Sequence, residues 1–252
     1  MIPNSIIQEI TNRIANSTEK VLDGRLKGEI ETEPSFTDRL LARIETDFEK
    51  PLFADNQGDI SISARTLRDR GRGSSEKKYG ADIATVLDVE LDDFKVNKGI
   101  LIQSKIVKNA SLLCESNIDA EYRRNKFFLR NSEISHRKTG TIEYSITPTL
   151  LDELKEQCKL MLEITPDSFV FLYAEDDIYV VSASSVIRKK RVGTKVKFHC
   201  KNLTLFMTEY LKCFLGDLKL NGTRDADFEK LREAYKARNI LQLSLLHKSA
   251  SR

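Results

Sequence analysis

Two β-rich runs place the strongest constraint on the fold of this chain. The segments ADIATVLDVEL (residues 81–91) and KGILIQSKIV (residues 98–107) are separated by the polar stretch from Asp92 to Lys98. This pattern predicts an antiparallel hairpin. Upstream, from Asp59, Ile60, Ile62 and Ala64 alternate with polar residues, as in a half-buried strand. Residues 168–183 have the pattern of a second hairpin, so the chain supplies several strands for one sheet.

Segments with helical spacing surround these strands. We expect helices over residues 5–20, capped by Asn4 or Ser5 and broken at Asp23-Gly24 and Gly28, and from near Pro34 to Pro51. Further helices are expected over residues 150–164, 203–215 and 228–246. Residues 115–147 have no clear period. The sequence therefore predicts an α/β fold, a mixed central sheet flanked by helices with further helices appended at the C-terminus. We expect a single domain, with an N-terminal helix in 1–28, a core in 29–182 and C-terminal helices in 200–252.

Composition favours a folded protein of the cytoplasm. Hydrophobic residues make up 40% and charged residues 31% of the 252 residues, too apolar a balance for a disordered chain. No apolar run reaches about 18 residues, and the N-terminal stretch carries Glu9 and Arg13, so neither a membrane span nor a signal peptide is expected. The net charge is only +3, so contact with nucleic acid has to come from local clusters.

The cysteines and histidines do not predict a metal site. The four cysteines lack CxxC spacing, which favours buried free thiols over a zinc knuckle or a disulfide framework. The three histidines, His136, His199 and His247, are scattered and receive no role.

The chemistry is expected on the first hairpin. Gln103 and Lys105 lie two residues apart on a strand and so point to one face, while Ser104 points to the other. An unpaired lysine or amide is costly in a core, so both are expected to face a wet site. Asp82, on the paired strand, brings a carboxylate toward Gln103. Such a group suits phosphodiester cleavage, in which oxygen ligands hold Mg²⁺, or Mn²⁺ as an alternative, and a lysine orients or deprotonates the attacking water.

The order of these residues resembles that of the PD-(D/E)XK nucleases. A helical acid is followed by Gly80-Ala-Asp-Ile83 and then by Ile102-Gln-Ser-Lys105, which is similar to the Mrr-type branch with its Q-x-K motif. The resemblance covers residues 29–105 by motif, and more loosely the helix with Gln157 and the strand 168–173. It departs from the family pattern in having Ala81 where many members have proline.

The resemblance implies a role for each matching residue. Asp82 corresponds to the metal aspartate, Gln103 to the Asp/Glu position and Lys105 to the catalytic lysine. Glu33 is the preferred helical acid, with Glu31 and Glu29 as alternatives. The implied protein has a restriction-endonuclease-like fold and is a Mg²⁺-dependent endonuclease that cuts double-stranded DNA in restriction or antiviral defence. By the same analogy it is a homo-oligomer, because one site cuts one strand.

Two basic clusters are candidates for contact with the DNA backbone. Residues 65–78 contain six cations just before Asp82, and this segment is either a DNA clamp or a solvated loop. Glu76 in the same segment is a further acid that could reach the metal. For residues 188–191 an exposed turn is favoured over a second contact. The residues expected to bind DNA are Arg68, Arg70, Arg72, Lys77 and Lys78.

Two alternatives remain open at this point. Gln103 in place of an acid favours a catalytically degenerate module that binds or senses DNA. The C-terminal helices favour a subunit of a larger defence complex, in which the nuclease is silent until a partner activates it.

Overall fold

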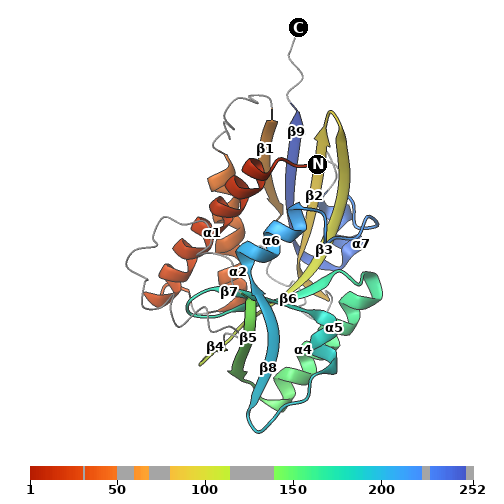
Figure 1. Ribbon diagram of the computed structural model, residues 1–252. Coiled ribbons are helices and arrows are strands. Elements are labelled where there is room, and N and C mark those ends of the chain that lie inside the picture. The colour runs from red at the N-terminus through yellow and green to blue at the C-terminus, as the bar shows by residue number, and fades with distance from the viewer. Residues whose placement is uncertain (31, 50–59, 68–79, 114–138, 223–227, 248–252) are drawn as a thin grey trace.

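A mixed nine-stranded sheet dominates the structure (Figure 1). The computed structural model describes residues 1–30, 32–49, 60–67, 80–113, 139–222 and 228–247. The strand order is β1-β9-β2-β3-β6-β7-β8-β5-β4. The pairs β2–β9 and β3–β6 are parallel, and the other neighbours are antiparallel. The predicted α/β class with a mixed sheet is confirmed.

The strands span most of the described chain. They are β1 Ile60–Leu67, β2 Ala81–Leu91, β3 Phe94–Ile106, β4 Ser111–Leu113, β5 Thr139–Ser145, β6 Ser168–Tyr173, β7 Ile178–Ser182, β8 Lys195–Asn202 and β9 Ala237–His247. Both predicted hairpins, β2–β3 and β6–β7, are present. The turn of the first is shorter than predicted, because Phe94 already belongs to β3 and only Asp92 and Asp93 reverse the chain.

Helices cover both faces of the sheet (Figure 1). The helices are α1 Asn4–Leu26, α2 Glu33–Phe48, α4 Pro148–Ile164, α5 Ala183–Arg188, α6 Leu203–Leu211 and α7 Phe228–Tyr235. Apolar residues of α1, α2 and α6 pack on one face of the sheet, which we call the first core. Residues of α4, α5 and α7 pack on the opposite face, the second core. Each face therefore has its own hydrophobic layer.

The predicted helices α2 and α4 are confirmed. Thr32 caps α2 and Thr147 caps α4, each accepting a bond from a backbone N–H three residues on, and each helix has proline in its first turn. The apolar side chains at helical spacing are buried in both. These two helices position the two sides of the candidate site described below.

The ends of α1 differ from the prediction. This helix runs through Gly24 to Leu26, and its first turn follows Pro3 without a side-chain cap from Asn4 or Ser5. The predicted break at Gly28 is confirmed, because the helix ends just before it and its φ of 76° lies in the left-handed region that glycine tolerates. A single glycine lowers helix propensity, but tertiary packing of the buried face outweighs that cost.

The largest correction concerns residues 237–247, which were predicted to extend a C-terminal helix. They form β9, which lies inside the sheet between β1 and β2. Helix α7 stops at Tyr235, and Lys236 then adopts a φ of 46°. The C-terminal part of the chain is thus not a set of appended helices, because it supplies a central strand. The predicted helix 203–215 is also shorter, since α6 ends at Leu211 and Cys213 has a φ of 64°.

A buried lysine closes the end of α6. Lys98 is 2% exposed, and its ammonium donates to the carbonyl oxygens of Tyr210 and Leu215. Its Nζ also lies 4.8 Å from the centre of the Tyr210 ring. Burial lowers the pKa of Lys98. Tyr210 lies in the last turn of α6 and Leu215 in the segment after it, so the lysine ties the end of the helix to that segment.

Other sequence expectations have mixed outcomes. Cys158 and Cys200 are buried free thiols as predicted, Cys213 is exposed, and Cys114 lies outside the described residues. The aromatic residues of the second hairpin are buried as core. Residues 139–145, which could not be assigned from the sequence, form β5. In the described part of the chain, no helix has the length and hydropathy needed to cross a membrane.

Candidate functional site

Asp82 is bonded to two consecutive residues of β3 where β2 begins. Its Oδ2 accepts hydrogen bonds from Gln103 Nε2 at 2.7 Å, Ser104 N at 2.8 Å and Ser104 Oγ at 2.6 Å. The ladder between the two strands starts one residue further on, at Ile83 and Ile102. At the open end of the hairpin, the carboxylate therefore takes the place of a backbone acceptor for the N–H of Ser104. The predicted approach of Asp82 to Gln103 is confirmed.

Ser104 joins this carboxylate to a chain of hydroxyl groups in the first core. Its Oγ lies 3.2 Å from Thr37 Oγ1 of α2, which lies 3.0 Å from the Tyr173 hydroxyl of β6. A hydroxyl has one proton to donate. Since Ser104 donates to Asp82, Thr37 donates to Ser104 and Tyr173 donates to Thr37. The chain thus orients the serine proton toward Asp82.

Glu33 and Lys105 form the second half of the site. Glu33, the first residue of α2, accepts hydrogen bonds from Lys105 Nζ and from Ile106 N, both at 3.1 Å. The two side chains are 24% and 25% exposed, so solvent reaches the pair. Lys105 accordingly meets the expectation of a wet position. Gln103 does not, because it is 2% exposed, and its hydrogen bond to Asp82 compensates for its burial.

Burial and mutual repulsion act on the two acids. Burial raises the pKa of Glu33, the charge of Lys105 lowers it, and the charge of Asp82 raises it again, with a net rise. Burial likewise raises the pKa of Asp82 against the lowering effect of the Ser104 hydrogen bonds. The two carboxylates are therefore close enough to repel each other, and a cation between them would relieve that repulsion.

The donor set fits a hard cation in part. Asp82 and Glu33 offer carboxylate oxygens, which Mg²⁺ and Mn²⁺ prefer. Gln103, however, presents Nε2 to Asp82, and its amide has to turn over before Oε1 can face the same ion. Within the described ranges, no group of three or more His, Cys, Asp or Glu side chains is placed to hold a metal. A metal here would rest on two acids, one amide oxygen and water.

Among the other predicted acids and cations, those that the structure describes lie outside this group. Glu29 forms an exposed ion pair with Arg39 at 3.5 Å, and Glu31 lies outside the described residues. Of residues 188–191, Arg188 ends α5 and the other three connect it to the turn at Gly193-Thr194, and Arg188, Lys190 and Arg191 are exposed, which agrees with the exposure expected from the sequence. Glu76 and the residues expected to bind DNA fall outside the described residues: Arg68, Arg70, Arg72, Lys77 and Lys78.

Strand β9 adds two residues that the sequence reasoning missed. Asn239 is buried and donates a 3.0 Å hydrogen bond to the backbone oxygen of Asp82. Arg238 lies next to Asp82 in the parallel register, between the pairs Ala81–Ala237 and Ile83–Asn239. The alternation of Leu241, Leu243 and Leu245 with polar residues was the available signal for a strand here.

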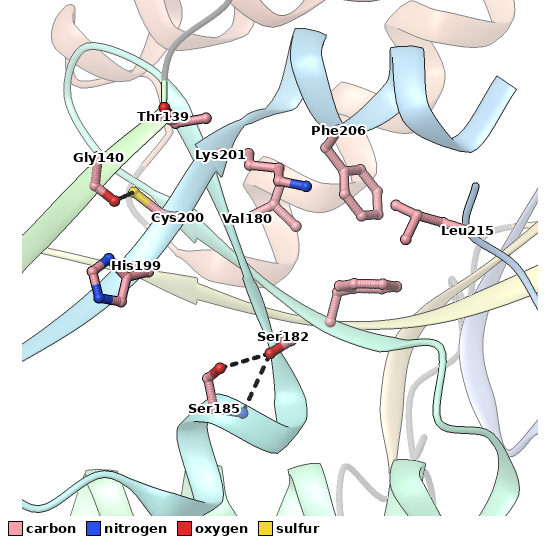
Figure 2. A pocket seen from close by; sticks show the side chains of 11 residues that line it. Thr139, Gly140, Val180, Ser182, Ser185, His199, Cys200, Lys201, Phe206 and Leu215 are labelled. Atoms are coloured by element: carbon pink, nitrogen blue, oxygen red, sulfur yellow. Dashed lines mark hydrogen bonds between the residues drawn. The ribbon is translucent and has the colours of Figure 1, made fainter. Parts of the chain in front are cut away.

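A separate pocket of about 390 Å³ lies elsewhere in the fold, between α6 and the strands β5 to β8 (Figure 2). Phe206 of α6 and Leu215 point into it, and Ser182 and Ser185 are hydrogen-bonded to each other on one side (Figure 2). No acid lines this pocket among the described residues, and none of the four predicted site residues contributes to it. Its lining is mainly apolar and, among the described residues, offers none of the carboxylates that a hard metal ion prefers, so the candidate site remains the one around Asp82 and Lys105.

Comparisons with protein-family models, with curated proteins and with solved structures each find no match to this chain. The function is therefore inferred from the residues of the site.

Proposed function

We propose that this protein is a metal-dependent nuclease that hydrolyses phosphodiester bonds in DNA, with a restriction-endonuclease-like core of the PD-(D/E)XK type. The observation that carries the proposal is the convergence of Asp82, Gln103, Lys105 and Glu33. These residues come from β2, β3 and the start of α2, and they form two hydrogen-bonded pairs, Gln103 with Asp82 at 2.7 Å and Lys105 with Glu33 at 3.1 Å. The order of helical acid, strand Asp and strand Q-x-K supports the same assignment.

Each side chain has a separate task in this proposal. Asp82 and Glu33 would hold the ion, and Gln103 would add an amide oxygen after its amide turns over. When bound, Mg²⁺ supplies a positive charge that stabilises the phosphorane-like transition state. Lys105 is held by Glu33 with its ammonium partly in solvent, where it can orient the attacking water or stabilise the charge on the phosphate. The buried Ser104 and Asn239 hold Asp82 in place from both sides.

Duplex DNA is the proposed substrate, and a restriction or antiviral role is the proposed setting. The cations of residues 65–78 precede Asp82 by a few positions, so they are available for the DNA backbone on the way into the site. A homo-oligomer is proposed because a symmetric pair of sites suits the two strands of a duplex.

One observation favours the rival reading of a degenerate module that binds DNA without cutting it. The Oδ2 of Asp82 already has three donors from Gln103 and Ser104, an arrangement that is complete without a metal. A site of this kind would keep its fold when metal is removed and would cut no DNA with or without metal.

The test is incubation of the purified protein with supercoiled plasmid and Mg²⁺ or Mn²⁺, with chelator as the negative arm. Cleavage that needs metal and disappears in Asp82→Asn supports the nuclease. DNA binding without cleavage in either metal supports the degenerate module. An inactive protein that becomes active on addition of cell extract would favour the alternative of a nuclease subunit that waits for a partner.

A further inference from the structure

Arg238 occupies a position beside the proposed catalytic acid that no step above uses. In the parallel register of β9 and β2, Ala237 pairs with Ala81 and Asn239 with Ile83, which places Arg238 next to Asp82. On the other side of Asp82 lies Gln103 of β3. The three residues form a row across three adjacent strands.

This row lies on one face of the sheet. Side chains alternate along a strand, so residues two apart share a face. Ala84, Leu101 and Ile240 all belong to the second core. Ala84 is two residues from Asp82, Leu101 is two residues from Gln103, and Ile240 is two residues from Arg238, so the row lies on the face of the second core. A cation, a carboxylate and an amide thus follow one another at the end of the hairpin.

The guanidinium group lacks a full set of partners. The Nε of Arg238 is buried and, within the described part of the chain, has no hydrogen-bond acceptor. The side chain is only partly buried, so the group reaches solvent elsewhere. Its charge nevertheless acts on Asp82, whose pKa it lowers. A buried donor without an acceptor is costly, and an anionic oxygen bound at this place would remove that cost.

We propose that Arg238 binds a phosphodiester oxygen of the nucleic-acid strand at this site, beside the Asp82 carboxylate. The proposal rests on the proposed nuclease function for the identity of the ligand. A guanidinium suits phosphate because its planar donors match two oxygens at once. Lys105 is already paired with Glu33 at 3.1 Å, so the two cations have different partners in the absence of DNA. Phosphate bound by Arg238 would lie next to the acid that is proposed to hold the metal.

The experiment measures the binding of a labelled DNA duplex in chelator, so that no cleavage occurs. Arg238→Gln removes the charge and keeps much of the shape, and Arg188→Gln at the exposed end of α5 is the matched loss of one charge. We expect Arg238→Gln to weaken binding by about tenfold, the loss of one charge-assisted hydrogen bond. The log-log slope of affinity against salt should fall by about 0.9 for the lost contact. The Arg188→Gln protein should bind as the unchanged protein does.

A second variant keeps the test valid if Arg238→Gln does not fold, as judged by circular dichroism. Arg238→Lys retains the charge without the planar fork and should show a partial loss of affinity. Equal binding and equal salt slope in the folded Arg238 variants would overturn the proposal, as would absence of DNA binding by the unchanged protein. If the unchanged protein binds DNA through Arg238 and cuts nothing in Mg²⁺, the nuclease function fails while the Arg238 contact stands.

Discussion

Ser104 Oγ donates a 2.6 Å hydrogen bond to Asp82 Oδ2, and Ser104 N donates a second one at 2.8 Å to the same oxygen. The sequence places Ser104 on the face opposite to Gln103, and the serine does contact Thr37 there. Because β2 and β3 are not yet paired at Asp82, the carboxylate lies at the end of the hairpin and reaches groups from both faces. This serine therefore holds the proposed metal ligand in position and lowers its pKa against the opposing effect of burial.

Ser104→Ala should destabilise the fold by about 2 kcal/mol, since a hydrogen bond to a charged group is lost in a buried place. The same change should raise the pKa of Asp82, because the Ser104 hydroxyl lowers it. Urea unfolding at several pH values measures both effects. The control is Thr37→Val, which removes a hydroxyl that lies two hydrogen bonds away from Asp82. This change should leave the pH dependence of stability nearly as it was. Identical pH profiles for all three proteins would show that Ser104 does not tune Asp82.

Lys105→Ala should lower the rate of plasmid cleavage by at least about a hundredfold, since one preorganised charge at a transition state contributes that much. Its ion pair with Glu33 is partly exposed, so stability should change by less than about 1 kcal/mol. Cleavage kinetics at saturating DNA and thermal unfolding give the two numbers. Lys95→Ala, which removes an exposed lysine paired with Glu90, is the matched control and should cut normally. A Lys105→Ala protein that unfolds would instead assign the lysine a structural role.

The two acids of the site predict how stability depends on pH without metal. The folded-state pKa of Glu33 and that of Asp82 are both raised above their ordinary values. Between the unfolded and folded pKa these two groups bind more protons in the native state, so their contribution to the free energy of unfolding falls as pH rises through that window. Glu33→Gln should flatten this decline because one of the two charges is gone. Unfolding in chelator across the acid range measures the pH dependence of stability for both proteins. The assignment would be contradicted if, in this window, the stability of the native protein rose with pH and that of the Glu33→Gln variant did not.

The sequence predicted the half of the site that depends on local pattern. Asp82 and Gln103 are neighbours because β2 and β3 form a hairpin. Two β-rich runs with a polar turn between them predict such a hairpin from sequence. Arg238 and Asn239 were missed because β9 is covered on both faces and paired on both edges. Apolar residues such as Ile240 and Leu241 then occur at consecutive positions and hide the strand period. The burial of Gln103 was also missed, because it depends on the hydrogen bond to Asp82 that compensates for the loss of water, and that bond is seen only in the structure.

The last prediction concerns Gln103, whose Nε2 lies 2.7 Å from Asp82 Oδ2 in a place that is 2% exposed. Gln103→Glu puts a second carboxylate at that distance, so in chelator the variant should lose roughly 3 kcal/mol of stability, the order of cost of an unpaired buried charge.

Mg²⁺ bound between the two acids would restore that loss, because a ligand that binds only the native state stabilises it by mass action. The rise in Tm on adding Mg²⁺ should therefore be larger for Gln103→Glu than for the unchanged protein. Gln103→Leu, which offers no oxygen, should stay folded, show no more Mg²⁺ stabilisation than the unchanged protein, and fail to cut. Thermal unfolding with and without Mg²⁺, together with a metal titration of cleavage, compares the three proteins. A Leu variant with full activity, or a Glu variant whose Tm ignores Mg²⁺, would remove Gln103 from the metal site.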